Sequence, residues 1–329
     1  MDKQTAIANL GNLNRNPKEY GKVAVLMGGE SAEREVSLNS GNAVLEGLIR
    51  KGVDAHAVDV RHPEIITRLL QEKFDAAFIA LHGPGDEDGA IQGLLEILRI
   101  PYTGSDLTAS SIAMNKIASK RIWQALGYPV LPYQILTKGF DPKAVIAELG
   151  LPLAVKPASQ GSTVGVSKVA HLDELLPAYE KAAVFPGDVM VEPWIEGKEF
   201  TVGIVGKAIL PSIYIQPAEP YYDYFAKYQS NDTQYFIPSG ISDEQENYLA
   251  DITKKAYHAL GCSGWGRADY MQDKQGNFWL LEMNTVPGLT DHSLVPMGIK
   301  ALGLTFDDLT LAILESIWPK KHAWLAQSD

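Results

Sequence analysis

GRADY at residues 266–270 and LLEMN at residues 280–284 predict two strands on either side of a short polar turn. Alternate residues of a strand share a face, so Arg267 lies with Asp269, and Glu282 lies with Asn284. If residues 274–277 form a four-residue hairpin loop, Asp269 is opposite Glu282 and Arg267 is opposite Asn284. Directly opposed side chains lie roughly 5 Å apart, so the two carboxylates would repel each other without a cation.

Two acids and an amide provide the hard oxygen ligands that suit Mg²⁺. The alternative is a solvated polar sheet face, but the neighbouring residues Phe278, Trp279 and Leu280 are too apolar for an exposed hairpin. The hairpin therefore predicts a divalent-cation site formed by Asp269, Glu282 and Asn284.

The composition is that of an ordinary soluble globular protein, with 46% hydrophobic and 21% charged residues among 329. This length exceeds a typical single core and predicts two or three domains. No apolar run approaches the roughly 20 residues needed to span a bilayer. Residues 1–20 are polar and broken by glycine and proline, and we expect them to form a mobile extension.

A net charge of −11 argues against nonspecific binding to nucleic acid or to an anionic membrane. The net charge is compatible with an anionic small ligand, because a few lysines can make a local positive pocket. Cys262 is the single cysteine, so no intrachain disulfide can form, and the cytoplasm is the expected compartment.

The first hundred residues alternate between strands and helices. We expect strands at 22–29, 53–60 and 75–81 and helices at 31–50, 63–73 and 89–98. This spacing predicts a parallel sheet with crossover helices, whose ligands bind at the carboxyl ends of the strands. Gly28, Gly29 and His82 fall at that edge.

The rest of the chain predicts an α+β arrangement with antiparallel pairing. After a helix at 107–126 we expect strands at 153–156, 164–169, 189–192, 199–205 and 208–215, with helices at 141–149, 172–182, 242–260 and 306–317. The segment 216–240 carries five tyrosines and predicts a long irregular loop that covers a substrate.

The segment KPASQGSTVG at 156–165 follows an apolar strand and is rich in small residues. Such a loop can turn several backbone N–H groups toward one anion, and Lys156 adds a positive charge. The order of a Walker P-loop is absent, and an ordinary flexible hairpin loop is the alternative. Lys116, within a predicted helix, is by itself most simply a solvated charge.

Three further positions have both structural and functional readings. Glu192 and Trp194 follow an apolar strand and could form one wall of a purine site, or simply an edge strand interrupted by Pro193. Glu33 lies at a helix start, where a carboxylate could bind an ammonium or simply favour the helix dipole. His82 is either a turn residue or a ligand contact.

No nucleophilic centre is evident in the sequence. Nothing marks Cys262 as an activated thiolate, no Gly-X-Ser-X-Gly elbow occurs, and no histidines cluster as zinc ligands. Carboxylates for a metal, a loop with lysines and an arginine beside the metal are instead what phosphoryl transfer uses.

Taken in order, several segments resemble the D-alanine–D-alanine ligase family of ATP-grasp enzymes over residues 22–318. They are GGESAEREVSLNSG (28–41), LHGPGDEDG (81–89), YTGSD (102–106), KPASQGSTVGVSKV (156–169), YDYFAKY (222–228), GWGRADYM (264–271) and LEMNTVPGLTDHSLVP (281–296). The resemblance implies a Rossmann-like N-terminal parallel-sheet domain followed by a two-part ATP-grasp fold. We expect an extension at 1–20, a substrate-binding domain at 21–105, and ATP-grasp subdomains at 106–196 and 197–329.

The resemblance also implies residue roles. ATP and two Mg²⁺ ions, for which Mn²⁺ substitutes, are the implied cofactors, with Asp269, Glu282 and Asn284 as the metal ligands. The implied nucleotide contacts are Lys116, Lys156, Gly161, Ser162, Glu192, Trp194, Ile195, Glu199 and Lys227. The implied substrate and catalytic residues are Glu33 and His82 at the first D-alanine, Ser293 and Leu294 at the second, Arg267 at the acyl phosphate, and Ser162 and Tyr228 in loop closure.

Pro193 departs from the lysine that many members of this family carry beside the adenine. The family also suggests a homodimer that acts on small molecules. The nearest alternative is a ligase that uses D-lactate, and the tyrosine at position 228 favours D-alanine. Two alternatives are more distant: a catalytically silent nucleotide-binding module and a nicotinamide-dependent dehydrogenase. Against the dehydrogenase, no Gly-X-Gly-X-X-Gly turn follows the first predicted strand.

Overall fold

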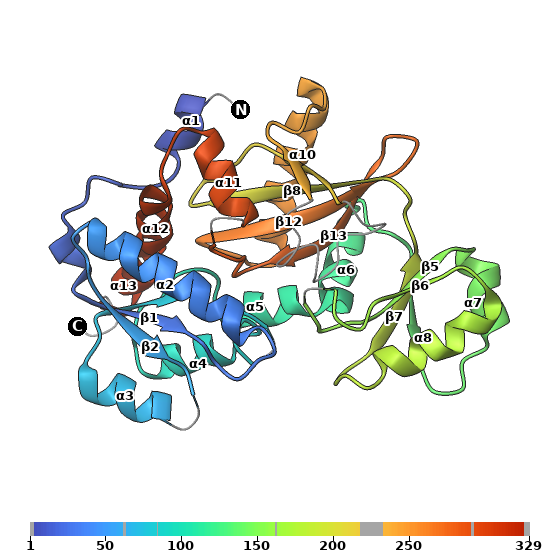
Figure 1. The fold of residues 1–329 in the computed structure, drawn as a ribbon, viewed down its shortest axis with the longest axis horizontal. Coiled ribbons are helices and arrows are strands. Elements are labelled where there is room, and N and C mark those ends of the chain that lie inside the picture. Colours follow the sequence, from blue (N-terminus) through green and yellow to red (C-terminus); the bar gives the residue numbers. More distant parts are fainter. Residues whose placement is uncertain are drawn as a thin grey trace.

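The computed structural model describes residues 3–61, 64–83, 85–161, 163–217, 233–290 and 293–325, with side chains up to residue 321. Its strands form sheets of three, six and four strands. Figure 1 shows the three- and four-stranded sheets on opposite sides of the molecule, with the six-stranded sheet between them. The expected combination of α/β and α+β parts is confirmed.

The N-terminal sheet is parallel, with strand order β2-β1-β3. Its elements are β1 (Lys22–Met27), α2 (Arg34–Arg50), β2 (Asp54–Asp59), α3 (Glu64–Glu72), β3 (Ala76–Ile79) and α4 (Ala90–Ile97). The apolar run of β1 is buried because it is the central strand. Gly29 follows it with φ of 76°, and a Cβ there would collide with Asp86, so glycine is required at this turn.

The six-stranded sheet has the order β11-β10-β8-β12-β13, and β9 pairs with β8. Its strands are β8 (Lys198–Val205), β9 (Ala208–Ile209), β10 (Ile213–Gln216), β11 (Gln234–Phe236), β12 (Trp265–Gln272) and β13 (Phe278–Asn284). The helices that follow β11 in the chain are α10 (Asp243–Ala259), α11 (Leu294–Ala301), α12 (Phe306–Leu314) and α13 (Trp318–Leu325), with the 3₁₀ turn η3 (Glu315–Ile317) before α13. The helices α10 and α11 pack on β8, whereas α12 packs on α2 beside the N-terminal sheet (Figure 1).

The four-stranded sheet is antiparallel, with the order β4-β7-β5-β6. Its elements are β4 (Gln134–Leu136), α7 (Pro142–Leu149), β5 (Leu153–Pro157), β6 (Ser167–Val169), η2 (Leu172–Glu174), α8 (Leu175–Ala182) and β7 (Val189–Pro193). Its apolar residues form a small core with α7 and α8.

Several predicted boundaries were wrong for local reasons. The strand expected at 164–169 begins at Ser167, because Thr163 and Gly165 both have positive φ and form a turn. The strand expected at 208–215 is divided into β9 and β10 around Pro211, which cannot donate a ladder hydrogen bond. The helix expected at 306–317 ends at Leu314. The loop expected at 216–240 contains β11, which pairs with β10.

The helix expected at 107–126 is two helices, α5 (Leu107–Met114) and α6 (Lys116–Ala125). Asn115 between them has ψ of 101°, and its side chain accepts hydrogen bonds from the backbone of Ile117 and Ala118. This capping starts a new helix at Lys116. Both helices pack with the core of the six-stranded sheet, where the Trp123 indole donates to the Ala256 carbonyl at 3.0 Å.

The N-terminal segment is not the mobile extension that its polarity predicts. Residues 3–20 contain α1 (Lys3–Ala8) and the 3₁₀ turn η1 (Pro17–Tyr20), and the side chain of Leu10 is buried in the main core. The Arg15 guanidinium pairs with Glu315 at 2.7 Å, and the Tyr20 hydroxyl donates to the same carboxylate at 2.6 Å. Docking against the C-terminal helices therefore orders this segment.

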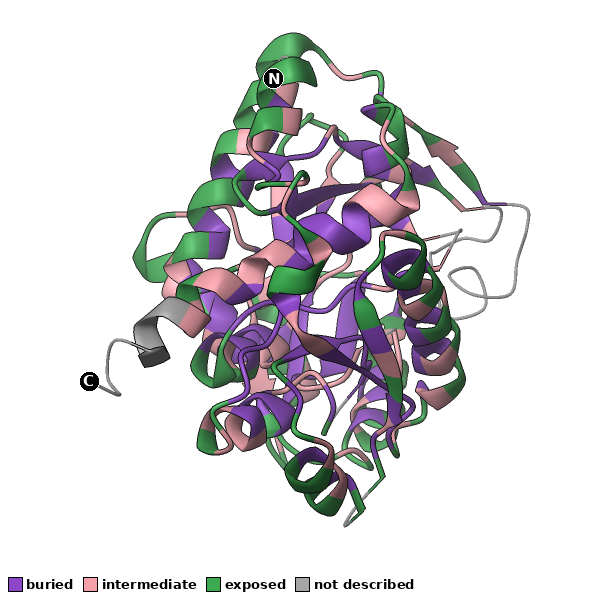
Figure 2. Cartoon of the chain, turned by 90° about the vertical axis from the view of Figure 1, so that its left-hand side faces the viewer, coloured by how far each residue is buried: buried purple, intermediate pink, exposed green. Residues whose placement is uncertain are grey.

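Figure 2 shows buried residues running through the interior of the molecule, with exposed residues mainly on the outer faces of the helices. Within the described part of the chain, no helix is both long and apolar enough to cross a membrane.

Candidate active site

The β12–β13 hairpin brings the predicted metal ligands together. Arg267 pairs with Asn284 and Asp269 pairs with Glu282, as the sequence predicts. The predicted loop is wrong, since Gln272 pairs with Phe278 and leaves five residues, 273–277, in the turn. That turn alone would set Asp269 opposite Leu281, but a β-bulge at Leu281 restores the pairing with Glu282.

Neighbouring cations neutralise both carboxylates. The Arg267 Nε and Nη2 atoms donate to Asp269 at 2.8 and 2.7 Å, and Asp269 also accepts from Thr201 at 2.6 Å and from Asn284 at 2.9 Å. The Glu282 carboxylate pairs with the Lys116 ammonium at 3.0 Å. The repulsion on which the metal prediction rested is therefore relieved within the protein. Among the described residues, no group of three or more His, Cys, Asp or Glu could hold a metal ion.

Two predicted phosphate-binding lysines lie on opposite sides of the loop that begins at β5. Lys116, the first residue of α6, donates to the Gln160 carbonyl at 2.7 Å. Lys156, the penultimate residue of strand β5, pairs with Glu192 on β7 at 2.5 Å. Both side chains are largely buried, so each charge must be matched by an acid or an anionic ligand.

A third lysine, which sequence reasoning missed, completes this cluster. Lys120 is fully buried, and its Nζ lies 2.8 Å from Glu192 Oε2. Burial by itself would raise the pKa of Glu192, but the adjacent Lys120 and Lys156 ammoniums outweigh it and lower the pKa to about 2. The sequence contained one indication of this role: Lys116 and Lys120 are four residues apart, which places both on one side of α6.

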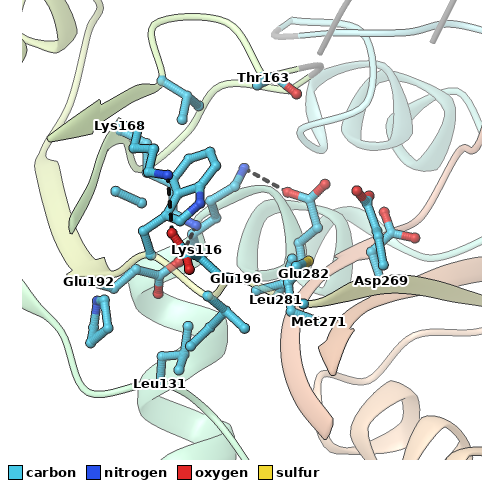
Figure 3. Close-up of a pocket in the computed structure, with 18 of the residues that line it drawn as sticks. Lys116, Leu131, Thr163, Lys168, Glu192, Glu196, Asp269, Met271, Leu281 and Glu282 are labelled. Atoms are coloured by element: carbon cyan, nitrogen blue, oxygen red, sulfur yellow. Dashed lines mark hydrogen bonds and ion pairs between the residues drawn. The ribbon is translucent and has the colours of Figure 1, made fainter. Parts of the chain in front are cut away.

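A cavity of about 450 Å³ lies between the four-stranded and six-stranded sheets. Figure 3 shows Lys116 and Glu282 directed toward each other across it, with Asp269 beyond Glu282. Of the predicted site residues, it is lined by Lys116, Lys156, Glu192, Trp194, Ile195, Glu199, Asp269 and Glu282. The structure adds the apolar residues Leu131, Met271 and Leu281, which the sequence did not single out. The cavity is therefore lined by both charged and apolar side chains.

Gly161 and Asn284 line a smaller adjacent cavity together with Lys116, Glu282 and Glu87. A Cβ on Gly161 would lie 3.3 Å from Glu33 and 3.7 Å from Glu87, so the loop backbone approaches both acids closely. Glu87 was also missed by sequence reasoning. Burial raises its pKa to about 8, and the carboxylates of Glu33 and Glu282 add to the effect.

His82 is enclosed where the N-terminal sheet meets the segment after β13. Its Nδ1 lies 3.1 Å from the Val286 carbonyl and must donate to it, so Nε2 accepts from Ser40 at 3.0 Å. Ser40 also accepts from the Leu289 amide at 3.2 Å. The ring therefore ties α2 to the 286–289 segment, and its predicted contact with substrate stays a prediction.

Burial lowers the pKa of His82 to about 4, against about 6.5 for an unfolded chain. The unfolded state then binds more protons between these values, so stability decreases as the pH falls through this window. The difference for this single group is about 2 kcal/mol between pH 7 and pH 5. We expect His82→Gln to remove that share of the pH dependence, as measured by urea unfolding at both pH values.

The comparison with the variant isolates His82, because Asp86 and Glu87 have raised pKa values that act in the opposite sense in both proteins. Equal stability changes between pH 7 and pH 5 in the two proteins would contradict the assignment of a neutral buried ring.

Ser293 and Leu294 lie at the start of α11. The Ser293 hydroxyl accepts from the Thr290 amide at 2.9 Å and makes no capping bond to its own helix. The first amides of α11 therefore lack a side-chain cap, an arrangement that suits a carboxylate.

The remaining predicted residues, Ser162, Lys227 and Tyr228, lie outside the described residues, as does most of the segment expected to cover the substrate. Cys262 is buried, which raises the pKa of its thiol to about 12 and agrees with the absence of a nucleophilic role.

Comparisons with known proteins show which family the chain belongs to. The family model of the D-ala D-ala ligase C-terminus matches residues 122–315, and the family model of the D-ala D-ala ligase N-terminus matches residues 63–105. The chain is 53% identical over 299 residues to the D-alanine–D-alanine ligase of Ectopseudomonas mendocina (strain ymp), covering 91% of this chain and 95% of that protein.

Solved structures of related enzymes have the same fold. The D-alanine–D-alanine ligase of Bacillus anthracis matches with a TM-score of 0.82 at 34% identity, and its complex with ATP with 0.80 at 32%; each match covers 92% of this chain and 99% of the other. The VanG D-Ala:D-Ser ligase of Enterococcus faecalis matches with a TM-score of 0.76 at 28% identity, covering 91% of this chain and 99% of the other. From its sequence and its fold, this chain belongs to the D-alanine–D-alanine ligase family.

Proposed function

We propose that the protein joins two D-alanine molecules to D-alanyl-D-alanine, a building block of peptidoglycan, and converts ATP to ADP and phosphate through a D-alanyl phosphate intermediate. The observation that supports this proposal is the 450 Å³ cavity, which is lined by Lys116 and Lys156 and by the Asp269–Glu282 pair. Apolar side chains together with lysines suit a nucleotide, because the base needs apolar contact and the phosphates need cations.

The nucleotide lies with its phosphates toward Lys116, Lys156 and the loop at Gly161, and its base against Trp194 and Ile195. Glu192 faces the base and Glu199 the ribose. Ser162 and Lys227, outside the described residues, are assigned to the phosphate tail by the family resemblance alone.

The residues fit two Mg²⁺ ions, with Mn²⁺ as a substitute. Asp269, Glu282 and Asn284 supply hard oxygen donors from neighbouring positions of one hairpin. Lys116, which now pairs with Glu282, would then be released toward the phosphates, while Arg267 would stay hydrogen-bonded to Asp269 beside the reacting carboxylate. The bound ions would neutralise phosphate charge during transfer.

The amino acids lie between the N-terminal sheet and the hairpin. Glu33 receives the ammonium of the first D-alanine, whose carboxylate oxygen takes the γ-phosphoryl group of ATP, and His82 supports this subsite. Ser293 and the Leu294 amide hold the carboxylate of the second D-alanine. Its amine, after losing a proton, attacks the acyl phosphate, Arg267 stabilises the resulting oxyanion, and phosphate leaves. Tyr228 and Ser162 would help to keep water out.

The function is tested by measuring phosphate release from ATP and Mg²⁺ with and without D-alanine, and by identifying the product by mass. We expect one phosphate for each D-alanyl-D-alanine. Phosphate release that does not depend on D-alanine would contradict the proposal, and no release at all would favour a silent nucleotide-binding module.

The second substrate separates close relatives, one of which is named as a D-Ala:D-Ser ligase. In mixtures of D-alanine, D-serine and D-lactate at neutral pH, we expect D-alanyl-D-alanine to dominate, because Tyr228 suits an incoming amine in this family. A dominant ester product with D-lactate would show that the assignment of the second site is wrong.

We also propose that the enzyme acts in the cytoplasm, where its nucleotide substrate is available, and that it is a homodimer by analogy with the family. Sedimentation equilibrium tests the latter.

A further inference from the structure

Lys120 lies behind the wall of the nucleotide cavity. Lys156 and Glu192 both line the cavity, whereas Lys120 is fully buried and is not among the lining residues. A ligand can therefore reach the acid and one lysine, while the other lysine stays in the protein interior.

The two lysines hold different oxygens of one carboxylate. Lys156 Nζ lies 2.5 Å from Glu192 Oε1, and Lys120 Nζ lies 2.8 Å from Oε2, although the latter pair lacks the angles of a full hydrogen bond. Burial lowers the pKa of Lys120, and Glu192 opposes that shift. A buried ammonium costs several kcal/mol unless it is paired, so Lys120 and Glu192 each depend on the other.

Nucleotide binding must change this cluster. When phosphates attract Lys156, Glu192 loses one of its two cations, and Lys120 is the one that remains beside it. Without Lys120, the carboxylate would be left buried against a base with no counter-charge, and it would tend to take up a proton.

We propose that Lys120 keeps Glu192 ionised and fixed while the nucleotide is bound, and that this selects purines that carry a 6-amino group. The inference rests on the proposed placement of the nucleotide. An ionised carboxylate only accepts hydrogen bonds, whereas a protonated one can also donate. The 6-amino group of adenine donates to it, but the 6-oxo group of hypoxanthine or guanine presents another acceptor. Lys120 is thus a positioning residue for base selection.

The test is the ratio of kcat/KM for ATP to kcat/KM for ITP, which differs from ATP in the 6-oxo base, measured from pH 6 to pH 8.5. In Lys120→Met we expect kcat/KM for ATP to fall by about tenfold, mainly through KM. The ATP:ITP ratio should also fall by about tenfold and decrease further toward low pH, where Glu192 becomes protonated. The KM for D-alanine should stay within about twofold.

Arg121→Met is the matched control, since Arg121 is the next residue of α6 and is exposed. It should leave the ratio and its flat pH profile unchanged. A wild-type ATP:ITP ratio in Lys120→Met at every pH would overturn the inference.

A second pair of variants replaces the carboxylate itself, and in the double variant neither charge of the buried Lys120–Glu192 pair remains. In Glu192→Gln, Lys120 should attract the amide oxygen, turn the amide NH₂ toward the base and so favour ITP. In Glu192→Gln combined with Lys120→Met the amide can turn either way, so the preference for ITP should disappear. Equal ratios in these two variants would contradict the inference even if Lys120→Met does not fold.

Failure of the proposed function would look different. If the wild type forms no dipeptide, displacement of a fluorescent ATP analogue by ATP and by ITP still measures base selection in the same variants. If no nucleotide displaces the analogue, the placement of the nucleotide is wrong, and the inference is overturned with it.

Discussion

Replacing Glu282 with glutamine is expected to lower kcat by about 10³-fold or more, with little change in the fold. Glu282 lies opposite Asp269 on the hairpin and lines the cavity beside Lys116. The change keeps the size of the side chain but removes a negative charge from a set that has only two acids and one amide. Loss of that charge weakens Mg²⁺ binding, which phosphoryl transfer requires.

The measurement is D-alanine-dependent phosphate release over a wide range of Mg²⁺ concentration. The variant should need much more Mg²⁺ and should not regain the wild-type rate. Glu180→Gln, at an exposed position of α8, is the control and should change neither property. A near wild-type rate at ordinary Mg²⁺ would contradict the role of Glu282.

Replacing Arg267 with methionine is expected to lower kcat by about 10²- to 10³-fold, while the KM values for ATP and D-alanine change little. The guanidinium is held by two hydrogen bonds to Asp269, so it is positioned before the reaction begins. Charge on the acyl oxygen grows only as the amine attacks, and a group that acts on that charge affects kcat more than KM.

Arg267→Lys separates charge from geometry. Lysine keeps the positive charge but cannot make the two-pronged contact with Asp269, so an intermediate rate is expected. Thermal unfolding of both variants checks that the core is intact. A large increase in KM with an unchanged kcat would show that Arg267 binds the ground state and that its catalytic role is wrong.

Local patterns were sufficient for much of the fold and for the centre of the site. The alternation of β12 and β13 predicts which face carries Arg267, Asp269, Glu282 and Asn284, and their pairing is confirmed. The predicted length of the hairpin loop was wrong, because the turn has five residues and not four. The pairing of Asp269 with Glu282 is nevertheless as predicted, because the bulge at Leu281 shifts the register by one residue and compensates for the longer turn. A bulge is fixed by packing on neighbouring strands, which one strand's sequence does not reveal.

Residues whose role depends on distant partners could not be predicted. A helical lysine such as Lys120 is usually solvated, and only the position of Glu192 on a strand far along the chain makes it a buried ion. Residues 1–20 look mobile by composition, yet Arg15 meets Glu315, 300 residues away. Asn115 could in principle have been read as a helix cap, since asparagine is a preferred N-cap residue.

The central claim is that the carboxylate of D-alanine takes the phosphoryl group of ATP before the peptide bond forms. D-alanine labelled with ¹⁸O in its carboxylate tests this directly, because the oxygen bonded to phosphorus leaves with the phosphate. Mass spectrometry of the inorganic phosphate should then find one ¹⁸O for each D-alanyl-D-alanine formed. Phosphate without ¹⁸O, formed together with the dipeptide, would contradict the acyl phosphate and with it the roles given to Arg267 and the hairpin.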